Sequence, residues 1–116
     1  MKRSNGSVLL ENEQSCTEQL ARFFPRAMPV RIPVQVTAIR SGRVKLREAT
    51  VVEFSGTENV IFSSTLPLEF DDRVRIENSG RTDSSDGIVI AVQYQEGRKA
   101  VAIRFTNGPC NWVTQA

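Results

Sequence analysis

Two arginines four positions apart, Arg22 and Arg26, are the first residues whose type and spacing suggest chemistry. Each guanidinium presents a rigid fork of donors that can hold a phosphate through two hydrogen bonds and can also stack on a flat base. A pair on the lead-in to a strand can therefore clamp an anionic nucleotide. Two solvated charges on a short helix have the same spacing, and both interpretations stay open on these residues alone.

A second polar group follows where two strands are expected to join, in the run Glu53-Phe54-Ser55-Gly56-Thr57-Glu58. Glu53 offers a carboxylate acceptor and Ser55 a hydroxyl, and the two could hydrogen-bond to the edge of a purine. A polar hairpin turn has a similar composition, so the local pattern also fits a purely structural role.

The residue types that are scarce exclude much other chemistry. The chain has no histidine, which most catalytic zinc and non-haem iron sites and most activated serine or cysteine nucleophiles require. Its two cysteines, Cys16 and Cys110, lie far apart without the spacing of a zinc site or a disulfide framework, and we expect both to be free thiols. We therefore expect a non-enzymatic protein without a metal or cofactor.

Charges of opposite sign are separated along the chain, although the net charge is only +2. Between residues 22 and 47 there is no acidic residue, whereas nine acidic residues lie between 48 and 86. An anionic partner would be sought on the first of these segments. Its seven basic residues are Arg22, Arg26, Arg31, Arg40, Arg43, Lys45 and Arg47.

The elements that must position these groups are one short helix and a series of short strands. With 116 residues there is room for one domain, which we place at 21–116 after a polar leader and the start of the helix at 1–20. Ser15 and Glu18 have the spacing of a capping box, and the helical pattern continues to Phe24 before Pro25 ends it. Alternating apolar residues then predict strands at 30–39, 43–54, 59–63, 72–77, 88–94 and 101–105.

Six short strands without a helix between them favour an antiparallel barrel or sandwich. Pro33 in the first strand is typical of an edge strand or of the start of a strand. Trp112 is the only tryptophan, and we expect it to close one end of the barrel. No apolar run is long enough for a membrane span or a signal peptide, so we expect the chain to stay in the cytoplasm.

Read together, these segments resemble the PilZ domain family over roughly residues 20 to 108. The resemblance rests on the order and spacing of several segments rather than on any one of them. They are the Arg22-x-x-x-Arg26 pair, Pro29-Val30-Arg31-Ile32-Pro33-Val34-Gln35-Val36, Glu53-x-Ser55-x-x-Glu58 followed by Val60-Ile61-Phe62, Leu66-Pro67-Leu68 with Asp72-Arg73-Val74-Arg75-Ile76, and Ala102-Ile103-Arg104-Phe105.

The resemblance implies an all-β fold, a six-stranded antiparallel β-barrel with a short N-terminal helix, that binds the bacterial second messenger cyclic di-GMP. It also implies that Arg22 and Arg26 bind phosphate and guanine, and that Ser55 keeps the serine role of the second motif. Glu53 stands where the family has Asp or Asn, and Glu58 where it has glycine. A carboxylate about 4 Å from a ligand phosphate would cost about 4 kcal/mol at an effective dielectric of 20, more than one arginine contact returns.

The sequence leaves two other functions open. A degenerate PilZ-like domain could act through protein contacts without a nucleotide, which the altered second motif favours. A small barrel could instead bind nucleic acid through the basic segment, although only Phe23 and Phe24 there offer stacking surfaces. We expect cyclic di-GMP as the ligand, with a protein partner as the alternative and nucleic acid as the weaker one.

Overall fold

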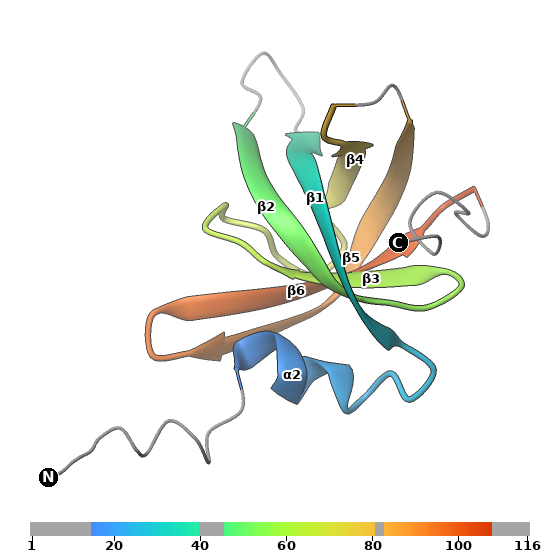
Figure 1. Cartoon of the computed structure of the whole chain (residues 1–116). Helices are drawn as coiled ribbons and strands as arrows, with labels where there is room; N and C mark the ends of the chain where they lie inside the picture. Colours follow the sequence, from blue (N-terminus) through green and yellow to red (C-terminus); the bar gives the residue numbers. More distant parts are fainter. Residues whose placement is uncertain (1–14, 40–45, 81–82, 108–116) are drawn as a thin grey trace, which may run out of the picture.

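The computed structural model describes residues 15–39, 46–80 and 83–107, and these form a closed antiparallel β-barrel flanked by one short helix (Figure 1). The strand order around the barrel is β1-β2-β3-β6-β5-β4, which confirms the all-β barrel predicted from the sequence. The elements are α2 (Cys16–Ala21), β1 (Met28–Ile39), β2 (Leu46–Ser55), β3 (Asn59–Ser63), β4 (Arg73–Asn78), β5 (Ser84–Gln95) and β6 (Arg98–Phe105).

The helix starts where the capping box predicts. The Ser15 side chain accepts a hydrogen bond from the Glu18 backbone N–H at 3.1 Å, and the Glu18 carboxylate accepts one from the Ser15 N–H at 2.8 Å. Helix α2 ends at Ala21, however, rather than at Phe24. The next residues form tighter turns, in which the Phe23 and Phe24 N–H groups donate to the carbonyls three residues earlier. Six residues are too few for a helix to be stable alone, so α2 depends on the barrel.

Strand β1 is not an edge strand of the closed barrel, because it pairs with β2 on one side and, from Val34 onward, with β4 on the other. Residues 28–33 pair with β2 only, so Pro33 stands just before the start of the β4 ladder, which agrees with the predicted position at an edge or at a start. Pro33 is tolerated because the ladder with β4 begins one residue later, at Val34, opposite Asn78. Proline has no backbone N–H to donate, and at position 33 the pairing with β4 does not require one. The strand predicted to begin at residue 43 is described only from Leu46.

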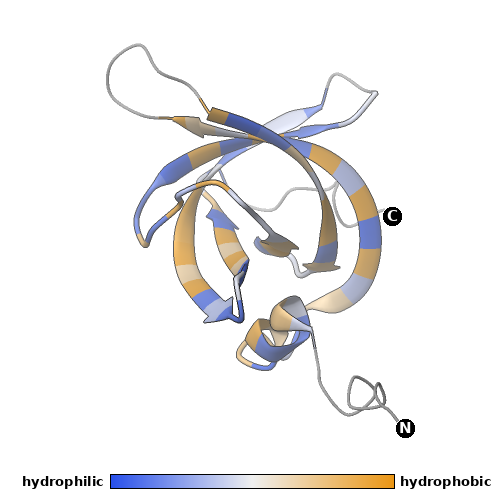
Figure 2. Ribbon diagram, turned by 90° about the vertical axis from the view of Figure 1, so that its left-hand side faces the viewer, coloured by the Kyte–Doolittle hydropathy of each residue, from blue (hydrophilic) through white to orange (hydrophobic). Residues whose placement is uncertain are grey.

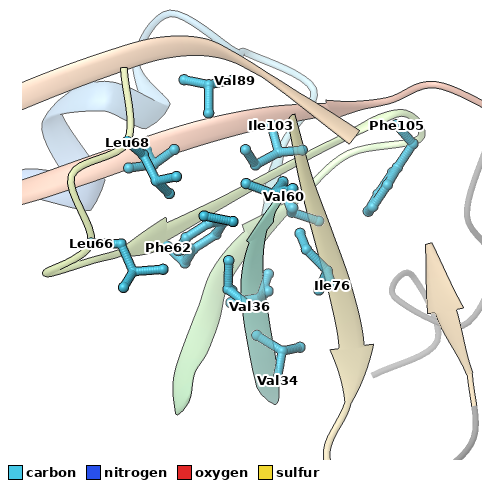
Figure 3. Packing of buried hydrophobic residues seen from close by; sticks show 14 of the residues in the cluster. Val34, Val36, Val60, Phe62, Leu66, Leu68, Ile76, Val89, Ile103 and Phe105 are labelled. Atoms are coloured by element: carbon cyan, nitrogen blue, oxygen red, sulfur yellow. The ribbon is translucent and has the colours of Figure 1, made fainter. Parts of the chain in front are cut away.

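Alternate residues along each strand face the barrel interior, as Figure 2 illustrates by the alternating hydropathy along the ribbons. Phe62, near the centre, has no exposed surface. Apolar residues from β1, β3, β4, β5, β6 and the β3–β4 connection pack around it (Figure 3). These include Val34, Val36, Val60, Leu66, Leu68, Ile76, Val89, Ile103 and Phe105.

A second, smaller apolar cluster lies on the outside of the barrel, beneath α2. Cys16 and Leu20 from the helix pack there against Ile61, Ala100 and Ala102 of β3 and β6. Helix α2 thus lies across the outer face of these strands (Figure 1), and it delivers the chain to the start of β1. Among the described residues, no helix is long and apolar enough to cross a membrane.

Candidate functional site

The pairing of β1 with β2 brings the two motifs of the sequence together. Met28 at the start of β1 lies opposite Ser55 at the end of β2, and Pro29 lies opposite Phe54. The lead-in at 22–27 must therefore pass beside the β2–β3 turn. An ideal Cβ on Gly56 would lie 3.8 Å from Ala27 Cα and 3.9 Å from the Arg26 carbonyl oxygen. In Figure 1 the light-blue lead-in and the green β2–β3 turn lie on the same side of the barrel.

A hollow of about 520 Å³ opens between the lead-in and this turn. It combines an aromatic wall, one cation and one carboxylate, which is a suitable lining for a ligand with a flat ring and an anionic group. The lining residues are Phe23, Phe24, Pro25, Arg26 and Ala27 from the lead-in, and Gly56, Thr57, Glu58 and Asn59 from the turn and the start of β3.

Both arginines of the first motif are exposed, as the receptor hypothesis requires before a ligand binds. Arg26 lines the hollow, whereas Arg22 is the C-cap of α2 and lies next to the lining residue Phe23. Within the described residues, neither arginine takes part in an ion pair. Their guanidinium donors are therefore available to an anionic ligand.

Glu53 and Ser55 do not line the hollow. The Glu53 carboxylate accepts a hydrogen bond of 2.6 Å from the Thr17 hydroxyl and so ties β2 to the docked helix. Ser55 is buried, and its hydroxyl donates to the Gly56 carbonyl at 3.3 Å. In this structure the two residues support the helix and the turn that form the walls of the hollow.

Glu58 lines the same hollow as Arg26, from the β2–β3 turn, and its side chain is exposed. Its backbone is not left-handed, since the only non-glycine residues with positive φ in the described part of the chain are Asp71 and Glu96. Its carbonyl accepts a hydrogen bond from the Phe105 N–H at 2.9 Å. The backbone therefore does not require glycine at position 58, and the glutamate differs from glycine there in its bulk and charge alone.

Helix α2 is held in place by polar contacts as well as by its apolar face. The Cys16 thiol donates to the Gln93 carbonyl at 3.1 Å, and the Gln93 side chain donates to Gln19 at 2.7 Å. Burial raises the pKa of the Cys16 thiol, and this residue is a free cysteine as expected. Because Arg22 caps this helix, the docking of α2 fixes where the lead-in begins.

Two of the predicted site residues, Arg26 and Glu58, line the same hollow, and so do Thr57 and Asn59, which the sequence analysis did not select. The signal for these two was their position, because Thr57 lies within the Glu53-x-Ser55-x-x-Glu58 motif and Asn59 directly follows it. Several other residues that the sequence singled out lie outside the described residues: Arg40, Arg43, Lys45, Cys110 and Trp112.

Comparison with known proteins adds no relative: no family model, curated protein or solved structure matches this chain.

Proposed function

We propose that this chain is a PilZ-like receptor for cyclic di-GMP, which binds in the hollow between the lead-in and the β2–β3 turn. The observation that carries the proposal is the pairing of Met28 with Ser55, because it places Arg26 and the turn containing Glu58 on opposite sides of one hollow. The volume of the hollow is within the range of about 300–1,000 Å³ typical of small-molecule sites. In this proposal the chain is a binding module of cytoplasmic bacterial signalling rather than an enzyme.

In this proposal Arg26 donates two hydrogen bonds to a ligand phosphate, and Arg22 supplies a second guanidinium from the end of α2. The ring of Phe23, which is 73% exposed, offers a face on which guanine can stack. Glu53 and Ser55 act as positioning residues through Thr17 and the Gly56 carbonyl. Glu58 opposes the phosphate, so we expect the affinity to be weaker than with glycine at this position.

Titration calorimetry with cyclic di-GMP tests the proposal. We expect Arg26→Ala and Arg22→Ala each to weaken binding more than tenfold, since a charge-assisted hydrogen bond contributes about 1.5–3 kcal/mol and about 1.4 kcal/mol is a factor of ten. The melting temperature should stay nearly unchanged because both side chains are exposed.

The matched control is Arg98→Ala, which removes an exposed arginine that does not line this hollow. It should leave nucleotide binding unchanged. GMP and short DNA should compete poorly. If DNA binds as tightly as cyclic di-GMP and its affinity falls steeply with salt, the nucleic-acid function replaces the one proposed.

A protein partner is the second candidate function, and the exposed apolar side chains beside the hollow favour it. Met28, the residue that begins β1, is 63% exposed, and Phe23 is also largely exposed. Exposed aromatic and methionine side chains are enriched at protein interfaces. This function replaces the receptor if neither the natural chain nor a Glu58→Gly variant binds cyclic di-GMP.

A further inference from the structure

The hydroxyl of Thr37 lacks a hydrogen bond on the outer face of the barrel, remote in the β1 ladder from the hollow. The neighbours Val36 and Ala38 face the interior, so Thr37 points outward, yet it is only 8% exposed. Its Oγ1 is the one buried side-chain polar atom in the described part of the chain without a hydrogen-bond partner. Buried hydroxyls are nearly always paired, because leaving one unpaired costs stability.

The strand register places an arginine on each side of this hydroxyl. Thr37 lies directly opposite Arg47 of β2 and, on its other side, directly opposite Arg75 of β4. Directly paired side chains share a face of the sheet and are in contact range. The two arginine side chains are 61% and 52% exposed, so they flank the threonine while their ends reach solvent.

Most donors of these two guanidiniums are not used by the described protein groups. Arg47 approaches Glu77 at 3.8 Å, which is longer than a hydrogen bond, and both side chains are exposed. Arg75 donates from Nε to Asp86 at 2.8 Å and from Nη2 to the same carboxylate at 3.4 Å. Its Nη1 therefore remains available.

We propose that Arg47, Thr37 and Arg75 form a binding site for one phosphoryl-type oxyanion on the outer face of β2, β1 and β4. Two strand spacings separate the arginines, about 10 Å, so both guanidiniums can close on one tetrahedral anion above the threonine. The Thr37 Oγ1 atom is covered while Arg47 reaches across β1 to Glu77, so the anion would first replace Glu77 as the partner of Arg47 and would then accept from the Thr37 hydroxyl, while Asp86 keeps Arg75 Nε. The site is separate from the hollow and does not depend on the function proposed for it.

The probe is inorganic phosphate, titrated against chloride at constant ionic strength and followed by amide chemical shifts and the melting temperature. We expect saturable shifts at residues 37, 47 and 75 with millimolar affinity. Thr37→Val, which keeps the shape of the side chain, should weaken binding at least fivefold and raise the melting temperature of the phosphate-free protein. Thr37→Ser should keep most of the affinity.

Arg47→Gln and Arg75→Gln should each abolish the saturable shifts, whereas Arg98→Gln, a control on the β5–β6 hairpin, should not change them. A second titration uses a short thymidine oligonucleotide. If the oligonucleotide shifts the same residues at a lower concentration than inorganic phosphate does, the site binds phosphate carried on a nucleic acid. If inorganic phosphate alone shifts them, the site binds the free anion. The proposal is overturned if phosphate leaves these residues unshifted or if Thr37→Val binds as well as the natural chain.

Discussion

At the scale of single residues, Glu58 decides how well the proposed nucleotide site works. Its φ is not positive, so replacing it with glycine relieves no left-handed backbone strain. Glu58→Gly removes a carboxylate and its bulk from the wall that faces Arg26, and we expect cyclic di-GMP to bind ten- to a thousandfold more tightly, about 1.4–4 kcal/mol. Calorimetry on the two proteins measures this directly.

Glu58→Gln serves as the matched control, because it keeps the size of the side chain and removes the charge. If Glu58→Gln gives most of the increase in affinity that Glu58→Gly gives, the effect comes from charge repulsion. If Glu58→Gln gives little of that increase, the effect comes from steric hindrance. Tight binding by the natural chain with no change in either variant would mean that the carboxylate points away from the phosphates.

Asp86 makes stability depend on pH through its contact with Arg75. The hydrogen bond from Arg75 is the main cause that holds the pKa of Asp86 below its ordinary value. The ionised form is thus favoured by folding, so its contribution is present at neutral pH and is lost as the pH falls through the lowered pKa. We expect the urea midpoint of the natural chain to exceed that of Asp86→Asn at pH 7, and the difference to shrink as the pH falls below the ordinary aspartate pKa of about 4. A constant difference across this range would contradict the assignment.

At the scale of elements, the docking of α2 controls access to Cys16. Leu20 and Cys16 are both 3% exposed beneath the helix, and the raised pKa of the thiol further lowers its reactivity. Leu20→Ala should weaken docking, since such truncations cost about 2–5 kcal/mol, and should speed alkylation of Cys16 at least tenfold. The measurement uses a Cys110→Ser background, in which Cys16 is the only thiol that can be alkylated.

The control for this experiment is Phe23→Ala, which removes an exposed side chain just beyond the helix and should leave the alkylation rate unchanged. Equal rates in the natural chain and Leu20→Ala would mean that α2 opens without breaking its apolar contacts. A faster rate combined with weaker nucleotide binding would tie the position of Arg22 to the docked helix.

The sequence predicted the bounds of these elements well where a local rule applied, and less well where contacts between distant segments set them. The capping box located the start of α2, but its end at Ala21 depends on how Phe23 and Phe24 turn toward the hollow. Likewise, the spacing of the two motifs, which resembles that of the PilZ family, predicted that Arg26 and Glu58 belong to one site. It did not predict the contact of Glu53 with Thr17. That contact joins residues on an outer strand face and a docked helix, whose relative position no sequence period encodes.

At the scale of the whole molecule, stability rests on one interior packed around Phe62. This side chain has no exposed surface, and truncating a buried phenylalanine costs about 3–5 kcal/mol. Because the total free energy of unfolding of a domain is about 5–15 kcal/mol, Phe62→Ala should lower the urea midpoint strongly or unfold the chain. Phe70→Ala is the control, since Phe70 is 69% exposed and its loss should change the free energy of unfolding by about 0.5 kcal/mol or less. Similar midpoints for both variants would contradict this view of the core.

The closed strand order has a consequence for how this protein can meet other chains. Every one of the six described strands has a hydrogen-bonded neighbour on both sides, although β1 pairs with β4 only from Val34 and β5 pairs with β4 only over 84–88. Over the paired stretches a foreign β-segment finds no template to extend, so the intermolecular sheet growth that leads to amyloid is restricted to the strand ends that lie beyond these ladders. Over those paired stretches, partners must recognise the barrel through side chains.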